Sequence, residues 1–318
     1  MFKEAEFENN HIGTAIQYFR ELYEISQSKL CKGLCSVSTL SRIEAGERDA
    51  DALLLETLLE RLGKTPNQFE IILTDFDYEA YLCRKEICKR IEDNDIEEAY
   101  RLINEYDKMV EGKVSPHKQF VIVRQAHLNE LEGGKSEKTI DLLMEGITYT
   151  VPDFNTSSIY EYFLSESEFN IIMDILEKMI ASRMKDSAEK IIDQLIEYLY
   201  WHKHMEQNRR NYPKVAAVAG KFYIEQNQLD KALKICNKGL ENHKGSYKMT
   251  YLGDLIHIKA QASERTLKSS GNWVGDNKKE CLKMFLEAYY TLEFCGDFTE
   301  ADKILKHVQE EYQWEDID

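Results

Sequence analysis

Residues 26–46 read SQSKLCKGLCSVSTLSRIEAG, and this stretch decides the fold of the first part of the chain. Ser26 and Ser36 are both good helix N-caps, so they predict two short helices, one directly after each serine. Gly33 falls in the turn between them, and Gly46 follows the second helix, where glycine readily takes the left-handed conformation. Four apolar residues are expected to meet underneath the crossed pair: Leu30, Leu34, Leu40 and Ile43.

Further helices are predicted on both sides of this pair. Residues 13–24 form an amphipathic pattern before it, and residues 51–62 form another after it. The sequence Thr-Pro-Asn-Gln at 65–68 predicts the start of a fifth helix, because it offers a capping oxygen, a proline at the first helical position and a glutamine three residues after the cap. We therefore expect a five-helix domain over residues 1–74.

The second helix of the pair presents short polar or methyl-bearing side chains outward, as a helix that enters the major groove of DNA requires. Arg42 on that helix can donate two hydrogen bonds to guanine or bind a phosphate. The stretch 25–43 contains no acidic residue, whereas Lys29 and Lys32 lie within it. The pattern is that of a helix-turn-helix with a locally positive face, in which the outward side chains are Val37, Ser38, Ser41 and Arg42.

From Cys35 to Gly46 the pattern Cys-Ser-x-Ser-x-Leu-Ser-Arg-Ile-Glu-x-Gly resembles the peptide-pheromone receptors of Gram-positive bacteria, the group that includes PlcR, PrgX and Rgg. Their DNA-binding domain is of the phage-repressor (Cro/C1) type. The resemblance is carried by the motif over about residues 13–74 and by helical organisation beyond them. It implies a C-terminal tetratricopeptide-like domain, dimeric binding to an inverted repeat, and a small signalling peptide held in the concave helical face.

The resemblance also implies roles for single residues. The first helix of the pair is expected to support Gln27 against the DNA backbone, while the outward residues of the second helix approach bases. Glu44 is expected to be structural, tying the helix end to neighbouring backbone. The full set expected to contact DNA is Gln27, Ser28, Lys29, Lys32, Ser36, Val37, Ser38, Thr39, Ser41, Arg42 and Arg48.

Residues 75–318 alternate polar turns with amphipathic helices. A small residue recurs just after the turn, where the two helices of a hairpin would approach closely; the examples are Ala99, Ala188, Ala232 and Ala301. The spacing is irregular and longer than the roughly 34 residues of a tetratricopeptide unit. We predict a degenerate tetratricopeptide-like solenoid that senses a ligand and dimerises the protein; a single irregular helical bundle is the alternative.

An extended peptide in a helical groove needs side chains that satisfy its backbone, and asparagine suits this because it both donates and accepts hydrogen bonds. The resembling family uses helix-borne asparagines in this way. Asn170 is the nearest match here, and Asn129 and Asn237 are further candidates. The alternative for each is a solvated polar position.

Arg124 is the candidate that would bind a peptide carboxylate, because it shares a helical stripe with Phe120 and Leu131. An internal salt bridge is the alternative for this arginine. Among many tyrosines on the candidate groove helices, Tyr223 and Tyr251 are expected to line the peptide site, unless they only fill space between helices.

Composition excludes several functions. The 41 basic and 57 acidic residues give a net charge of −16, so DNA contact must come from a local basic surface. Seven cysteines without a CxxC pair argue against a disulfide framework. His202 and His204 lie two apart, on different helix faces, which disfavours a metal site. No catalytic motif or phosphate-binding loop occurs, so no enzyme activity and no cofactor are expected.

The start MFKEAEFENN is acidic and polar, unlike a secretory signal, and no apolar run is long enough to cross a bilayer, which predicts a cytoplasmic protein. The sequence thus predicts a homodimeric transcription regulator that binds double-stranded DNA and is controlled by a peptide. Two alternatives stay open: a protein-interaction adaptor, and a DNA-binding regulator that answers to a small molecule or a protein.

Overall fold

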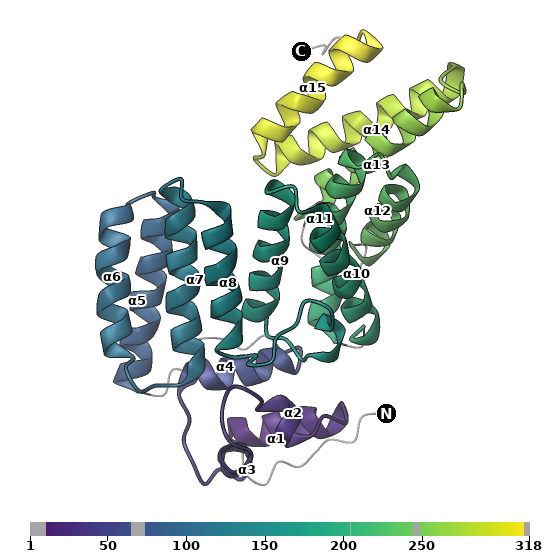
Figure 1. Ribbon diagram of the computed structural model, residues 1–318. Helices are drawn as coiled ribbons and strands as arrows, with labels where there is room; N and C mark the ends of the chain where they lie inside the picture. The colour runs from purple at the N-terminus through teal and green to yellow at the C-terminus, as the bar shows by residue number, and fades with distance from the viewer. Residues whose placement is uncertain (1–10, 65–73, 204, 244–248, 315–318) are drawn as a thin grey trace. The chain divides into compact units, whose positions relative to one another are not determined.

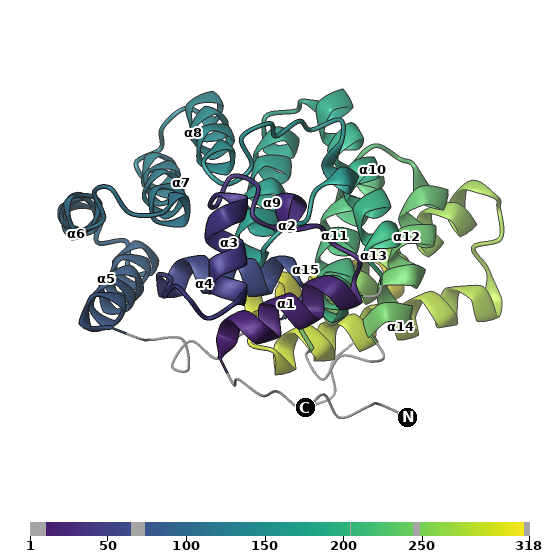
Figure 2. The same ribbon diagram turned by 90° about the horizontal axis from the view of Figure 1, so that it is seen from below.

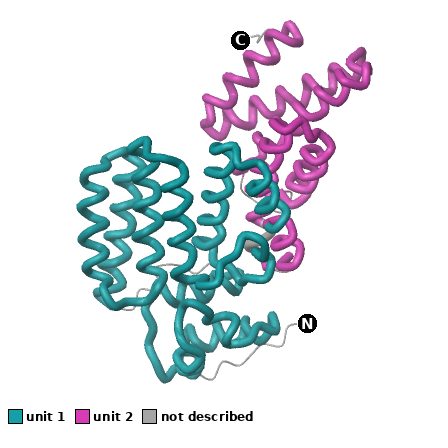
Figure 3. The backbone as a smooth tube through the Cα atoms, in the orientation of Figure 1, with its two compact units in different colours: residues 1–194 teal, residues 195–318 magenta. Residues whose placement is uncertain are grey.

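The structure, a computed structural model, describes residues 11–64, 74–203, 205–243 and 249–314. These residues form fifteen α-helices and one 3₁₀ turn, and no strand occurs among them, which confirms the predicted all-α class. The chain divides into two compact units, residues 1–194 and residues 195–318 (Figure 3).

The first four helices follow the predicted pattern. Ser26 and Ser36 cap the two helices of the central pair, each accepting a hydrogen bond from the backbone N–H three residues on. The predicted fifth helix at 65–74 falls largely outside the described residues. The observed bounds are α1 Ile12–Leu22, α2 Gln27–Leu30, α3 Val37–Glu44 and α4 Ala52–Arg61.

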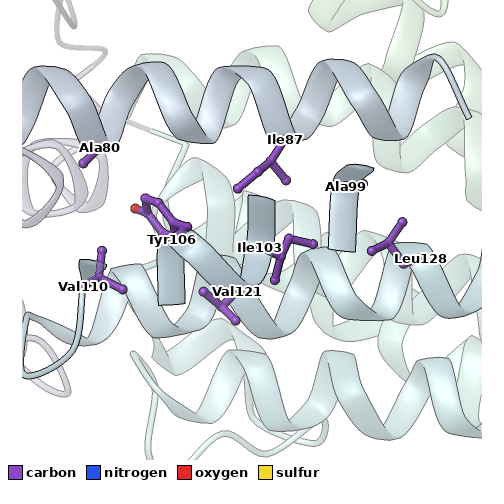
Figure 4. Close-up of a cluster of buried hydrophobic side chains, with 8 residues drawn as sticks. All are labelled: Ala80, Ile87, Ala99, Ile103, Tyr106, Val110, Val121 and Leu128. Atoms are coloured by element: carbon purple, nitrogen blue, oxygen red, sulfur yellow. The ribbon is translucent and has the colours of Figure 1, made fainter. Parts of the chain in front are cut away.

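The remainder of the first unit consists of antiparallel helices that stand side by side (Figure 1). Each of α5 to α8 packs against its successor in the chain, and α5 also packs against α7. The helices are α5 Asp75–Glu92, α6 Ile96–Met109, α7 Ser115–Leu131, α8 Ser136–Thr148 and α9 Glu166–Ala181, with a 3₁₀ turn at Ile159–Glu161. Figure 4 shows the core of α5, α6 and α7, built from Ala80, Ile87, Ala99, Ile103, Tyr106, Val110, Val121 and Leu128.

The second unit repeats the same arrangement around its own core. Helix α11 packs against α12 and α13, and α14 packs against α13 and α15. Helix α10, Lys185–Trp201, runs across the division between the units, and the others are α11 Glu206–Glu225, α12 Leu229–His243, α13 Leu252–Ser269, α14 Gly275–Phe294 and α15 Phe298–Tyr312. The four small residues predicted at close approaches, Ala99, Ala188, Ala232 and Ala301, are all buried. Within each unit successive helices stack on one another, which confirms the predicted helical-repeat organisation rather than one irregular bundle.

The boundary predicted at residue 74 stays a prediction, because residues 65–73 lie outside the described part of the chain. Within the first unit, α4 lies across the ends of the helical pairs and packs against α7 and α9 (Figures 1 and 2). The helix that closes the N-terminal four-helix region therefore also touches the repeat helices.

Candidate functional site

The helix pair α2–α3 has the core and the outward face that the sequence predicts. Leu30, Leu34, Leu40 and Ile43 are all buried beneath it. On the other side, Ser38, Ser41 and Arg42 are exposed, and Val37 is 44% exposed although it is apolar. We call these four residues, Val37, Ser38, Ser41 and Arg42, the outward face.

Glu44 stabilises this pair through side chains. Its carboxylate accepts hydrogen bonds from Nε and Nη2 of Arg20 at 2.6 and 2.9 Å, and from Nε2 of Gln27 at 2.7 Å. The structural role expected of Glu44 holds, but the expected backbone partners are replaced by these side chains. Gln27 is accordingly held by Glu44 at the start of α2, and its carboxamide nitrogen is used within the domain.

The flanking candidates are arranged around the outward face. Ser36 caps α3 through the amide of Thr39, and Nη1 of Arg48 donates to the hydroxyl of Thr39 at 3.4 Å. Ser28 is exposed, and its hydroxyl lies 3.0 Å from that of Ser26. These contacts rigidify the edges of the outward face and leave Arg42 exposed on it.

Two lysines expected to contact DNA meet the segment that joins α8 to α9. Lys29 lies 5.6 Å from the ring centroid of Phe163, and Lys32 forms a 2.6 Å ion pair with Asp153. The hydrogen bond from Lys32 holds the pKa of Asp153 below its usual value. Both partners of this ion pair are more than half exposed, so it contributes little stability and a DNA phosphate can compete for Lys32.

A buried ion pair joins α4 to α9. Arg61 donates to both carboxylate oxygens of Glu168, at 2.6 and 3.2 Å, and each side chain is at most 3% exposed. The same guanidinium donates to the carbonyls of Leu30 and Lys32 at the end of α2, and to that of Thr150. Burial opposes ionisation of Glu168, but Arg61 and the amide of Ser165 together lower its pKa. We call Arg61 and Glu168 the α4–α9 joint.

A cavity of about 1010 Å³ lies in the first unit between α4, α5, α7 and α9. We call it the inner cavity. Its volume is at the upper end of the range of about 300–1,000 Å³ typical of ligand pockets. Two predicted peptide-binding residues, Arg124 of α7 and Asn170 of α9, both line it, although they are far apart in the sequence. Apolar lining comes from Leu53, Leu82, Phe120, Val123 and Ile171.

Arg124 has no carboxylate partner among the described residues. Its Nη1 lies 3.8 Å from Sγ of Cys88, its guanidinium carbon lies 5.3 Å from the ring centroid of Phe120, and its Nε is buried without a hydrogen bond. The alternative of an internal salt bridge is therefore not what the structure shows. Arg84 of α5, which the sequence analysis did not single out, lines the same cavity and likewise forms no ion pair within the described chain.

The wall of the inner cavity that α4 contributes is acidic. Glu56 and Glu60 lie there, and an oxygen of Glu60 accepts a 3.0 Å hydrogen bond from the backbone N–H of Glu166. Burial raises the pKa of Glu60 to about 8, and the nearby carboxylates of Glu56 and Glu166 add to the effect. The cavity thus has cations on α5 and α7 and carboxyl groups on α4, and further acidic side chains line it from α5 and α9: Glu86, Glu92 and Asp174.

The other predicted ligand contacts lie elsewhere. Asn129 is buried, and its Nδ2 donates to the hydroxyl of Thr139 at 2.9 Å, so its carboxamide holds the α7–α8 hairpin together. Tyr223 is buried in α11 under Lys231, and Asn237 is exposed on α12. Tyr251 caps α13 in a left-handed conformation. These last three belong to the second unit, and none of them lines the inner cavity.

Sequence reasoning missed Arg61, Glu168 and Arg84. Two local signals for the α4–α9 joint are present in the sequence: an arginine on the apolar face of α4, and the pattern Ser165–Glu168, which forms a capping box in the structure.

Of the two histidines at 202 and 204, His204 lies outside the described residues. Within the described residues no group of histidine, cysteine and carboxylate side chains is arranged to hold a metal ion. None of the described helices is apolar over a length that would cross a membrane.

Comparison with known proteins identifies the N-terminal domain. Residues 16–69 match the family model described as Helix-turn-helix. A search of curated proteins gives no match. The chain therefore begins with a DNA-binding domain of the helix-turn-helix class, followed by a helical-repeat region.

Several solved structures are similar to this chain over nearly its whole length. PlcR of Bacillus thuringiensis, in complex with the peptide PapR7 and DNA, is 17% identical with a TM-score of 0.55, covering 92% of this chain and 98% of its own. Its apo form is 15% identical with the same TM-score, covering 93% and 98%. The pheromone receptor Rgg2 of Streptococcus dysgalactiae is 13% identical with a TM-score of 0.48, covering 95% and 100%. The likeness to PlcR shows a common fold.

Proposed function

We propose that this protein is a sequence-specific transcription regulator whose DNA binding is controlled by a short peptide held in the inner cavity. The DNA-binding half is supported by the helix-turn-helix domain and by the exposed outward face. In this proposal the exposed Arg42 reads guanine or binds a phosphate. The peptide half is supported by the fold shared with PlcR, a protein solved with both a peptide and DNA bound.

The single observation that carries the peptide half is the pair of arginines in the inner cavity. In a chain with 57 acidic residues, Arg84 and Arg124 line one cavity and neither forms an ion pair with a described carboxylate. A partly buried guanidinium without a carboxylate partner is costly, and a carboxylate of a bound ligand would remove that cost. Asn170 of α9 lines the same cavity, and in this proposal its carboxamide hydrogen-bonds the peptide backbone.

The protein acts in the cytoplasm, as a homodimer on an inverted repeat. A dimer must place its two copies of α3 about one turn of DNA apart, roughly 34 Å, or a multiple of that spacing. Residues Lys29, Lys32, Arg42 and Arg48 of each protomer bind phosphates or bases. With that many contacts the DNA affinity should fall steeply with salt, with a log–log slope on the order of −5 to −7.

The DNA-binding half is tested by selecting bound sequences from a random DNA pool with the full-length protein. Arg42→Ala should lower the affinity for the selected sequence by about 10- to 100-fold, because a bidentate arginine–guanine contact is worth about 1–3 kcal/mol. Arg101→Ala, at an exposed arginine of α6, is the control and should bind as the wild type does. Equal affinity of the Arg42 variant and the control would remove Arg42 from the interface.

The peptide half is tested by selecting ligands from a display library of linear decapeptides on the full-length protein. A selected peptide should compete for the inner cavity, lose affinity with Arg124→Met, and change the affinity for the selected DNA. If no peptide is enriched, or if enriched peptides leave DNA affinity unchanged, control by a small molecule or a protein becomes the better account.

A further inference from the structure

Arg84 differs from Arg124 in what lies behind it. It lies one helical turn before Cys88 on α5, so the two arginines occupy neighbouring parts of the inner cavity. Nη1 of Arg84 donates a 3.2 Å hydrogen bond to the hydroxyl of Tyr106, which is fully buried on α6. The other N–H groups of its guanidinium have no partner among the described residues. Arg84 therefore has one donor engaged with the core and the rest available to the cavity.

The hydroxyl of Tyr106 continues into a buried chain of hydrogen bonds. It lies 2.6 Å from Nδ1 of His117, a side chain that is 1% exposed, and Nε2 of His117 lies 3.0 Å from both carboxylate oxygens of Asp51. Because a carboxylate only accepts, Nε2 of His117 must carry the hydrogen; in the neutral imidazole Nδ1 then accepts from the hydroxyl of Tyr106. All three bonds thus run in one direction, from the cavity to Asp51.

The protonation states needed for this direction agree with the surroundings. Burial raises the pKa of Tyr106 to about 12, so its hydroxyl keeps the proton that it donates. Burial also opposes ionisation of Asp51, but the hydrogen bond from His117 and the amides of Leu53 and Leu54 lower its pKa below the usual value. A protonated tyrosine and an ionised aspartate are the end states that the chain requires.

The chain ends on the first turn of α4. Asp51 is the N-cap of that helix and accepts a 3.0 Å hydrogen bond from the backbone N–H of Leu53, while Asp77 of α5 accepts from the N–H of Ala52. At its other end α4 carries Arg61, which donates to the carbonyls of Leu30 and Lys32 at the end of α2. A change at Asp51 therefore acts on the helix that supports the helix-turn-helix pair.

We propose that Arg84 binds an anionic group of the ligand in the inner cavity, such as a peptide carboxylate. Binding there changes the hydrogen bonds of Tyr106, His117 and Asp51 in turn, and so alters the N-terminal cap of α4. We call this chain of hydrogen bonds the relay. A ligand carboxylate that accepts from the remaining N–H groups of Arg84 draws the guanidinium away from the hydroxyl of Tyr106. Since successive hydrogen bonds in a buried chain polarise one another, loss of the first bond weakens the bond at Asp51 and loosens the cap of α4.

This inference rests on the proposed function and gives the two arginines separate tasks. Arg124 meets Cys88 and Phe120, and no described hydrogen bond connects it to α4, so it contributes affinity for the ligand. Arg84 contributes affinity for the ligand and, in addition, couples ligand binding to the helix-turn-helix pair. The ligand class that fits is a peptide with at least one carboxylate directed at α5 and α7.

The relay can be tested without ligand or DNA, by hydrogen exchange of the full-length protein at residues 52–55. Arg84→Met and Tyr106→Phe should each speed exchange there by about fivefold, the loss of roughly one hydrogen bond. The double variant should exchange no faster than either single variant, because both changes break the same chain. Lys85→Met, at an exposed neighbour that lines the same cavity, should leave exchange unchanged. Additive effects, or an effect of Lys85→Met equal to that of Arg84→Met, would overturn the relay.

A second arm uses the decapeptide enriched on the wild-type protein. Its binding should speed exchange at residues 52–55 of the wild type, whereas Tyr106→Phe should bind it equally well without that response. A Tyr106→Phe variant that responds as the wild type does, or an Arg84→Met variant that binds the decapeptide with unchanged affinity, would contradict the inference. If no peptide is enriched, the proposed function fails while the ligand-free cycle still decides whether the relay exists.

Discussion

The α4–α9 joint and the inner cavity lie in the same unit, but their arginines differ in whether they have a carboxylate partner. Arg61 is buried with a bidentate carboxylate and three backbone carbonyls, so its donors are used and the contact is closed. Arg84 and Arg124 face a cavity, and neither has a carboxylate partner among the described residues. Arg61 therefore stabilises the fold, whereas Arg84 and Arg124 can still accept a carboxylate from a ligand.

The largest effect is expected at the α4–α9 joint. Arg61→Met leaves Glu168 buried without its partner and should lower the free energy of unfolding of the first unit by about 3–5 kcal/mol. Urea unfolding followed by circular dichroism measures this as a lower midpoint. The double variant Arg61→Met with Glu168→Leu removes both charges and should recover much of the loss. A single variant as stable as the wild type would show that the joint is not a structural contact.

A smaller effect is expected for Arg124 in the inner cavity. Arg124→Met should leave stability nearly unchanged, because no ion pair is lost, but should weaken binding of the selected decapeptide by about 10- to 100-fold, as expected for one charged hydrogen bond. Arg90→Met is the matched control, since Arg90 lies on α5, is paired with Glu86 and Asp95, and does not line the cavity. Titration calorimetry measures the affinity of each variant for the decapeptide. Equal affinities of Arg124→Met and Arg90→Met would show that Arg124 does not contact the ligand.

A third effect, on the pH dependence of stability, concerns the acidic wall of the cavity. The pKa of Glu60 is about 8 in the folded protein, above its value of about 4.3 in an unfolded chain. The folded state therefore binds the extra proton, and stability should decrease as pH rises from about 4.5 to about 8. Glu60→Gln, which cannot ionise, should flatten this part of the profile of melting temperature against pH. Profiles that coincide for the variant and the wild type would place Glu60 in solvent.

The helix-turn-helix pair could be predicted from the sequence because its signals are local. Ser26 and Ser36 each cap a helix within three residues, and Gly46 takes a φ of 71° where the helix ends. Gly33, at a φ of 75°, also needs to be glycine because a Cβ there would lie 2.0 Å from the carbonyl oxygen of Thr150. The first of these requirements is visible in the sequence, and the second depends on a residue far along the chain.

The cavity could be predicted only in part. Arg124 was predicted from its place on a helical stripe and Asn170 from the resemblance to the peptide-pheromone receptors, and the fold brings both to one cavity. Asn129 shows the same sequence signal, yet its carboxamide is used by Thr139 ten residues later. Arg61 and Glu168 are 107 residues apart, and nothing in the local pattern of either residue indicates the other. Pairings of this kind depend on how helices stack, which the irregular spacing of the repeats does not specify.

The most direct test of the account is the affinity of the full-length protein for its selected DNA sequence, measured with and without the selected decapeptide at fixed salt. The account predicts at least a fivefold difference in the wild type, a reduced difference in Tyr106→Phe, and no difference in a variant that carries both Arg84→Met and Arg124→Met. A wild-type affinity that is the same with the cavity empty and filled would contradict it.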